Sequence, residues 1–174
     1  MPEVRKIYII GFMGSGKSTA GRRLASGLGW SFIDLDKRIE EYTALRIPEI
    51  FSRHGEEYFR KVESEVLRNL HCEENTIIST GGGTPCYEDN MKYMLDTGLT
   101  IYLKMTPAQL KRRLAGSSTE RPLIKDISRD KLQEFIEIKL SEREKWYDRA
   151  GLIVDALYTD SALLLMLVKK SILY

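Results

Sequence analysis

Cysteine and histidine are scarce in this sequence, with two residues of each among 174. Cys72 and Cys86 form neither a C-x-x-C pair nor a metal-ligand spacing, and His54 and His71 lack the partners of a metal site or a catalytic triad. These absences exclude a disulfide-stabilised secreted scaffold. They favour a reducing compartment, so we expect a cytoplasmic protein.

The sequence also lacks a strong excess of charge of one sign and a long hydrophobic run. The net charge is +2 and basic residues alternate with acidic ones, as on solvated helix faces, so we expect no nucleic-acid partner. The longest apolar stretch, Ala162–Val168, is far too short to span a bilayer, and the N-terminal residues resemble a strand rather than a secretory signal. We therefore expect no membrane association, and no apolar pattern argues against a monomer.

What is present is a regular alternation of short apolar runs with longer helical patterns. Continuous Ile, Val, Leu and Tyr runs are typical of strands buried on both faces. We expect strands at Lys6–Ile10, Phe32–Asp34, Thr76–Thr80, Thr100–Leu103 and Leu152–Val154. We expect helices at Lys17–Leu28, Asp36–Leu45, Glu56–Leu70, Glu88–Asp96, Pro107–Leu114, Arg129–Arg149 and Ser161–Ile172. Thr106 before Pro107 predicts a helix start with the threonine as cap.

This alternation predicts an α/β fold with three layers, α/β/α, in which a central five-stranded parallel sheet is covered by helices on both faces. The length suits a single domain over residues 1–174, with no repeat or linker to divide it. In such folds, ligands bind beyond the carboxyl ends of the strands. Functional residues are therefore expected directly after strands.

The segment Gly11–Thr19 follows the first strand and has the pattern G-x-x-x-x-G-K-S of a phosphate-binding loop (P-loop). Glycines let successive backbone N–H groups approach phosphate oxygens, and the following helix adds the positive end of its dipole. The lysine reaches the β- and γ-phosphates, and the serine hydroxyl ligates Mg²⁺. The pattern predicts nucleotide binding through Gly14, Ser15, Gly16, Lys17, Ser18 and Thr19.

Two further absences narrow the class of P-loop protein. No Asn-Lys-x-Asp element of a regulatory GTPase occurs, and the third strand ends in Thr80-Gly81-Gly82-Gly83 rather than in the acidic residue of larger ATPases. Small size then favours a kinase of nucleosides or metabolites. Each glycine costs about 0.5–1 kcal/mol in backbone entropy relative to alanine, which favours close approach of this backbone to a ligand. A flexible turn is the alternative.

Charged residues after the P-loop supply candidates for an acceptor site. Asp34 and Asp36 end the second strand, where one carboxylate would act near Mg²⁺ and the other would accept the proton of an attacking hydroxyl. The alternative is that Asp36 only caps a helix starting at Lys37. Arg60 and Arg143 suit bidentate recognition of a carboxylate, although an isolated arginine is more often solvated or part of a structural ion pair.

The stretch between Ala115 and Ile127 is polar and joins two helices, which predicts a mobile lid. Arg121-Pro122 would bring a positive charge onto the phosphates, while the closed lid excludes water. An ordinary exposed loop is the alternative.

In this order, and over nearly the whole chain, the motifs resemble the shikimate kinase family. The matching segments are Gly11–Thr19, Asp34-Leu35-Asp36, Phe51, Phe59-Arg60, Gly81-Gly82-Gly83, Arg121-Pro122-Leu123 and Arg143. The resemblance implies transfer of a phosphoryl group from ATP, with Mg²⁺, to the 3-hydroxyl of shikimate. The products would be shikimate 3-phosphate and ADP, in the chorismate pathway to aromatic amino acids.

The resemblance also implies roles for individual residues. Lys17, Asp36 and Arg121 would be catalytic, with Asp36 as the base, and Ser18 and Asp34 would hold Mg²⁺. The acceptor would be bound by Asp36, Phe59, Arg60, Gly81, Gly82, Gly83 and Arg143, with Phe51 as a further wall of the pocket, in the helices of residues 34–62 and beyond.

The sequence offers fewer candidates for contacts to the nucleotide base. The family offers an arginine before the lid to stack on adenine, and Arg112 and Arg113 are both candidates on different helix faces. Spacing alone does not choose between them; we assign Arg113, with Arg121, to the nucleotide. No basic residue occurs in Asp155–Tyr158, where some relatives supply another.

Two other functions compete with this one. A gluconate-type or nucleoside monophosphate kinase would share the P-loop and the lid, but would need other acceptor-binding groups. A nucleotide-binding module without catalysis would be expected to have lost Lys17, an aspartate of the pair or Arg121, and all are present.

Overall fold

Five parallel strands form one sheet in the order β2-β3-β1-β4-β5. This computed structural model describes residues 5–70, 75–116 and 122–173. The strands are β1 (Lys6–Ile10), β2 (Ser31–Asp34), β3 (Thr76–Ser79), β4 (Leu99–Lys104) and β5 (Leu152–Asp155). In the register of the central strand β1, Ile9 lies opposite Ser79 on one side and Ile101 on the other. The carboxyl ends of β2, β3 and β1 therefore lie side by side.

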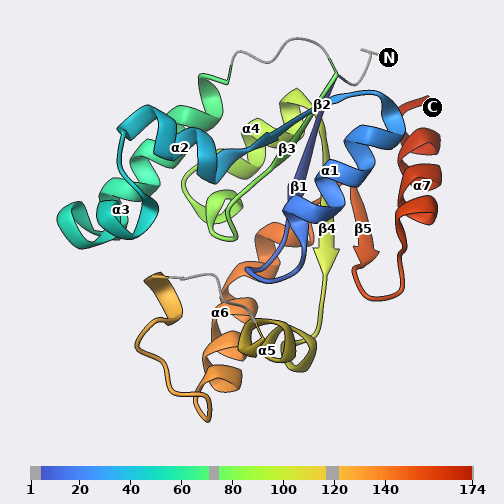
Figure 1. Cartoon of the computed structure of the whole chain (residues 1–174). Coiled ribbons are helices and arrows are strands. Elements are labelled where there is room, and N and C mark those ends of the chain that lie inside the picture. The colour runs from blue at the N-terminus through green and yellow to red at the C-terminus, as the bar shows by residue number, and fades with distance from the viewer. Residues whose placement is uncertain (1–4, 71–74, 117–121, 174) are drawn as a thin grey trace.

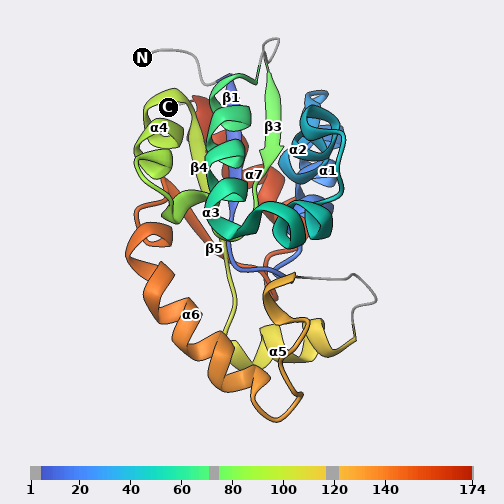
Figure 2. The ribbon, with the colours of Figure 1, turned by 90° about the vertical axis from the view of Figure 1, so that its left-hand side faces the viewer.

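Helices cover the sheet on both faces (Figures 1 and 2). They are α1 (Lys17–Leu28), α2 (Leu35–Thr43), α3 (Ile47–Arg68), α4 (Asn90–Thr97), α5 (Pro107–Ala115), α6 (Leu132–Tyr147) and α7 (Ser161–Leu173), with two short 3₁₀ helices, η1 (Thr84–Cys86) and η2 (Pro122–Ile124). Figure 1 shows α1 and α7 on one face, and α3 and α4 on the other. Within the described ranges, no helix has both the length and the apolar character needed to cross a bilayer.

The alternation of side chains along β1 explains both layers. Ile7 and Ile9 belong to a core that includes buried residues of α1 and α7, among them Leu24 and Val168. Tyr8 and Ile10 point the other way, into a larger core with buried residues of α3, α4, α5 and α6. A strand buried on both faces must be apolar throughout, which is why its sequence is a continuous hydrophobic run.

The predicted three-layer fold with a five-stranded parallel sheet is confirmed. The bounds of β1 and α1 coincide with those expected; β2, β3 and β5 differ by one residue at one end, and β4 by one residue at each end. The predicted cap of α5 is also present, since the N–H of Gln109 donates to the Thr106 hydroxyl at 3.3 Å and the Thr106 N–H donates to the Gln109 side chain at 2.9 Å.

The expected start of α3 at Glu56 is wrong, because α3 begins at Ile47 and continues through a break at Gly55. Gly55 has φ 80° and ψ 174°, a conformation that residues other than glycine rarely adopt. The segment before it begins beyond Arg46, whose N–H donates to the Glu49 carboxylate at 3.0 Å. Because Gly55 interrupts the helical pattern of the sequence, the helical segment that precedes it and the kink were not predicted. Further along the chain, α6 begins at Leu132 rather than at the expected Arg129.

Candidate active site

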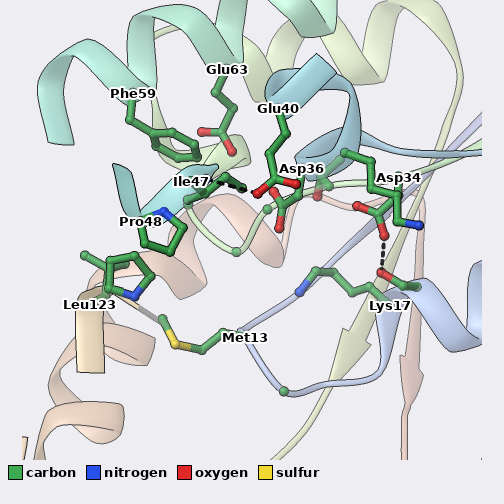
Figure 3. Close-up of a pocket in the computed structure, with 18 of the residues that line it drawn as sticks. Met13, Lys17, Asp34, Asp36, Glu40, Ile47, Pro48, Phe59, Glu63 and Leu123 are labelled. Carbon is green, nitrogen blue, oxygen red and sulfur yellow. Dashed lines mark hydrogen bonds between the residues drawn. The ribbon is translucent and has the colours of Figure 1, made fainter. Parts of the chain in front are cut away.

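A cavity of about 1030 Å³ opens at the carboxyl ends of β1, β2 and β3. Its walls come from the P-loop, the end of β2, the start of α3, the glycine run after β3, and the C-terminal part of α6. In Figure 3, Asp34, Asp36 and Lys17 lie on one side of the cavity, and Phe59, Pro48 and Leu123 lie on the other. The cavity therefore has a charged side, and opposite it an apolar wall that lies beside Glu63 and Arg60.

The P-loop connects β1 to α1, and some of its residues adopt backbone conformations that favour glycine. Gly14 and Gly16 have φ of 82° and 91°, in the left-handed region that favours glycine. Lys17 is buried, and its Nζ donates to the Phe12 carbonyl at 3.0 Å. The Ser15 hydroxyl is buried and has no hydrogen-bond partner among the described residues. A buried, unpartnered donor in a loop at a helix N-terminus fits a loop built to hold phosphate.

Ser18 and Asp34, expected to hold Mg²⁺, are in direct contact. The Ser18 hydroxyl donates to Asp34 Oδ2 at 2.8 Å and lies 3.2 Å from the hydroxyl of Ser79. Ser79 was not predicted to be a site residue. Its position at the end of β3, paired with Asp34 in the register of β2 and β3, could have suggested that it lies at the site. Oxygen ligands with a single carboxylate fit Mg²⁺, which completes its coordination with water and substrate phosphates.

Asp36 lines the same cavity from the first turn of α2. Its Oδ1 lies 3.5 Å from the point that a side chain on Gly81 would occupy. The alternative in which Asp36 caps a helix starting at Lys37 is wrong, because α2 begins at Leu35 and Asp34 is the residue at its N-cap, without a side-chain capping bond. Asp36 therefore lies within the first turn of α2, where it lines the cavity, and it does not act as the N-cap of the helix.

Arg60 is buried and held by two carboxylates on its own helix. Its Nη1 donates to Glu63 at 2.7 Å and its Nη2 donates to Glu56 at 3.2 Å. Burial lowers the pKa of Arg60, but the charges and hydrogen bonds of Glu63 and Glu56 outweigh that effect and raise it. Glu63 is completely buried and accepts a further bond from the Thr84 hydroxyl at 2.5 Å. Glu63 was not predicted from the sequence, although its position three residues after Arg60 could have suggested this pairing.

Arg143 approaches the cavity from α6 and is also buried. Its guanidinium lies over the Phe12 ring, 5.3 Å from the ring centroid. Its Nη1 is buried without a hydrogen-bond partner, and Arg143 forms no salt bridge within the described part of the chain. Neither arginine is the solvated surface residue that each alone would suggest.

Gly81, Gly82 and Gly83 are packed against these same side chains. A side-chain carbon would lie 2.5 Å from Glu63 Oε1 at Gly81 and 3.3 Å from Arg143 Nη1 at Gly82, and at Gly83 it would overlap the guanidinium of Arg60. The run is therefore not a loosely held turn. The close approach that its glycines permit is to Glu63, Arg60 and Arg143 of the protein itself.

Aromatic rings complete the apolar side of the cavity. Phe51 and Phe59 are 4.8 Å apart between ring centroids, and Arg60 lies 5.2 Å from the centroid of Phe59. Both rings line the cavity, as the sequence suggested. They come from opposite sides of the break at Gly55, so the kink in α3 determines how they meet.

The structure separates the two candidates for the adenine contact. Arg113 lines the cavity, and its Nη2 lies 3.1 Å from the point that a side chain on Gly16 would occupy. Arg112 is not among the residues that line it. Arg121 lies outside the described residues, so its position on the lid stays a prediction. Pro122 and Leu123, which follow it, line the cavity.

A parallel sheet in the order 2-3-1-4-5 with a P-loop after β1 and a charged acceptor pocket beside it defines a P-loop kinase of small molecules. The family model that matches, over residues 13–169, is that of shikimate kinase. The chain belongs to the shikimate kinase family and, like its members, is an ATP-dependent kinase.

The relatives cover most of the chain. It is 40% identical over 153 residues to the shikimate kinase of Parabacteroides distasonis, with 88% of each chain covered. It is 43% identical over 151 residues to that of Azobacteroides pseudotrichonymphae, with 86% of this chain and 89% of the relative covered.

Solved structures agree. The shikimate kinase of Bacteroides thetaiotaomicron superposes with a TM-score of 0.89 at 35% identity, covering 98% of this chain and 99% of the other. The Acinetobacter baumannii enzyme in complex with shikimate gives a TM-score of 0.86 at 30% identity, covering 98% and 93%. A gluconokinase from Sinorhizobium meliloti shares the fold, with a TM-score of 0.63 at 13% identity.

Proposed function

We propose that this enzyme transfers the γ-phosphoryl group of ATP to the 3-hydroxyl of shikimate, with Mg²⁺, giving shikimate 3-phosphate and ADP for aromatic amino acid biosynthesis. The observation that carries the choice of acceptor is Arg143. It is a buried cation in the cavity wall whose Nη1 has no hydrogen-bond partner within the described residues. A buried unpaired charge is unfavourable, so the site calls for an anionic ligand, and the guanidinium suits a carboxylate.

Arg60 supplies the second cation of the carboxylate site. Because Glu63 and Glu56 already offset its charge, Arg60 would mainly orient the acceptor carboxylate and would add little net positive charge to the site. Arg143 contributes the charge that remains uncompensated. Together the two guanidiniums, with the glycine run between them, would hold the acceptor by its carboxylate and present its hydroxyl groups to Asp36.

The chemical step follows from the other residues of the cavity. Asp36 accepts the proton of the attacking hydroxyl as that oxygen forms its bond to phosphorus and the bond to ADP breaks. Lys17 and the P-loop N–H groups stabilise negative charge on the phosphate oxygens, and Arg121 would add to this from the lid. Ser18 and Asp34 would hold Mg²⁺, which when bound neutralises part of the phosphate charge. The Phe51 and Phe59 side of the cavity limits access of water.

A screen of acceptors with ATP and Mg²⁺, followed by coupled detection of ADP, tests this proposal. Shikimate should support turnover, and gluconate and the nucleoside monophosphates should not. Turnover of gluconate or of a nucleotide without turnover of shikimate would reject the acceptor. Tight binding of ATP without transfer to any of them would instead favour a module without catalysis.

We also propose that the protein acts as a cytoplasmic monomer without nucleic-acid or membrane partners. The low cysteine content and the balanced charge support this proposal. Sedimentation of the purified chain at the concentration of the assay tests the monomer, and a dimer with higher activity per chain would contradict it.

A further inference from the structure

Two tyrosines lie packed together near the glycine run, and only one of their hydroxyls is used by the described residues. Tyr102 of β4 and Tyr147 at the end of α6 have ring centroids 4.9 Å apart, and both are buried. The Tyr147 hydroxyl donates to the carbonyl oxygen of Gly82 at 2.5 Å. The Tyr102 hydroxyl is buried without a partner among the described residues. Tyr147 thus packs its ring in the core, and its hydroxyl makes a polar contact to the acceptor site.

The Gly82 carbonyl is the one carbonyl of the run that a side chain holds in the described structure. The carbonyls of Gly81 and Gly83 accept bonds from the backbone N–H groups of Thr84 and Cys86, at 3.3 and 2.9 Å. Because a peptide unit is planar and trans, fixing the Gly82 carbonyl also fixes the N–H of Gly83, which points the opposite way. Neither the Gly82 nor the Gly83 N–H donates to another residue within the described ranges, and both glycines line the cavity.

Tyr147 and Arg143 reach Gly82 from the same face of α6. They are four residues apart, which places their side chains one above the other on a helix. Arg143 Nη1 lies 3.3 Å from the point that a side chain on Gly82 would occupy, and the Tyr147 hydroxyl holds the carbonyl of the same residue. Figure 2 shows α6 leading from the region of α5 up to the sheet, so a single helix brings both groups to the run.

The state of the hydroxyl agrees with this role. Burial raises the pKa of Tyr147, and the neighbouring Arg143 lowers it by less. The phenol therefore stays protonated at neutral pH, and it is the donor in its bond to the carbonyl.

We propose that Tyr147 is a positioning residue for acceptor binding: its hydroxyl fixes the Gly82–Gly83 peptide against Arg143, so that a backbone N–H and a guanidinium face the acceptor carboxylate together. The inference rests on the proposed function, since it assumes an acceptor with a carboxylate at this site. Tyr147 touches neither reacting atom, so it should act on binding and not on the chemical step.

The two tyrosines offer a matched pair of hydroxyl deletions. In Tyr147→Phe, we expect the KM for shikimate to rise about tenfold, with kcat and the KM for ATP changed less than about twofold. In Tyr102→Phe, which removes an unpartnered hydroxyl from the neighbouring ring, all three constants should stay at wild-type values. An unchanged KM for shikimate in Tyr147→Phe, or equal loss of kcat and of both affinities, would show that the tyrosine only packs.

The wild-type arm separates this inference from the proposed function. If the wild type does not phosphorylate shikimate, both the proposed function and this inference are rejected. If the wild type does so and Tyr147→Phe keeps its KM, only the inference fails. Should Tyr147→Phe not fold, amide spectra of the wild-type enzyme titrated with shikimate decide. The Gly82 or Gly83 amide should shift and become protected from exchange, and no change at either would overturn the inference.

Discussion

The two halves of the cavity are built in different ways. The donor half is the P-loop, Gly11–Thr19, where consecutive residues present backbone groups at the start of one helix. The acceptor half consists of Asp36, Arg60, Gly81–Gly83 and Arg143, which come from three helices and the loop after β3. The donor half is fixed by local backbone conformation, whereas the acceptor half is fixed by contacts between side chains distant in the sequence.

The difference indicates which changes each half tolerates. In the donor half, the critical property of Gly14 and Gly16 is a positive φ, so backbone geometry limits substitution. In the acceptor half, the critical property is pairing. Glu63 holds Arg60, Thr84 holds Glu63, and Tyr147 holds Gly82. A substitution of one of these residues should therefore displace its partners. The difference between the donor half and the acceptor half can be tested by experiment.

The largest effect is expected where the two halves meet, at Asp36. In Asp36→Asn, kcat should fall by about 10²–10⁴-fold because the amide cannot accept the proton of the hydroxyl. ATP binding, measured with a fluorescent nucleotide, should persist. Asp96→Asn is the control, since Asp96 is an exposed carboxylate of α4 that pairs with Lys92. A normal kcat in Asp36→Asn would mean that Asp36 is not the base.

The next experiment compares Arg60→Met with Arg143→Met. Both should raise the KM for shikimate, by about 10–100-fold, because each removes a charge-assisted contact. Only Arg60→Met should also destabilise the fold, by about 3–5 kcal/mol, since it leaves the carboxylate of Glu63 buried without its cation. Denaturant unfolding measures the difference. Equal loss of stability in both variants would contradict the contrast between a paired and an unpaired arginine.

The donor half is tested by two glycines at opposite ends of α1. Gly16 and Gly29 both have positive φ, 91° and 70°, but only Gly16 has neighbours where a side chain would be, namely the guanidinium of Arg113. Alanine at either position should destabilise by about 1 kcal/mol. Only Gly16→Ala should raise the KM for ATP, by about tenfold, as the loop N–H groups move off the phosphates. A similar KM in both variants would show that backbone strain alone explains the effect.

The smallest effect concerns the packing beneath the acceptor half. Burial raises the pKa of Cys86 to about 11 from 9.0, with Arg143 and Arg60 opposing the change. Because the folded pKa is the higher one, the thiol's contribution to stability is intact below about pH 9 and is lost as the pH rises towards 11. In a Cys72→Ser background, alkylation of Cys86 by iodoacetamide should follow this raised pKa. Alkylation that follows a pKa near 9 would mean that the thiol is not buried in solution.

The donor half could be predicted from the sequence because its geometry is local. Gly11–Thr19 encodes the turn, the helix start and the lysine within one motif, and the bounds of β1 and α1 coincide with those expected. The assignment of Asp36 to the cavity also followed from position, since it comes directly after a strand of a parallel sheet.

The pairing in the acceptor half could not be predicted in the same way. Glu63, Thr84 and Tyr147 are ordinary residues of a helix, a loop and another helix until the fold brings them to Arg60 and to the glycine run. The glycine run was expected to approach a ligand, yet a side chain at Gly81 or Gly83 would first meet Glu63 or Arg60 of the protein itself. The first segment of α3 was missed because Gly55 interrupts the helical pattern, although the chain resumes the helix after it.

Gly55 also makes the handedness of a single residue a determinant of pocket shape. Its dihedral angles, φ 80° and ψ 174°, have a mirror image that lies in the broad extended region open to every L-residue. No atom lies within 4 Å of the point that an L-side chain would occupy there, so crowding is not what selects glycine. A D-amino acid at position 55 would therefore adopt these dihedral angles without backbone strain and restrict the unfolded chain more than glycine does. The relative placement of the backbone at Phe51 and Phe59 thus depends on the sign of φ at one achiral residue.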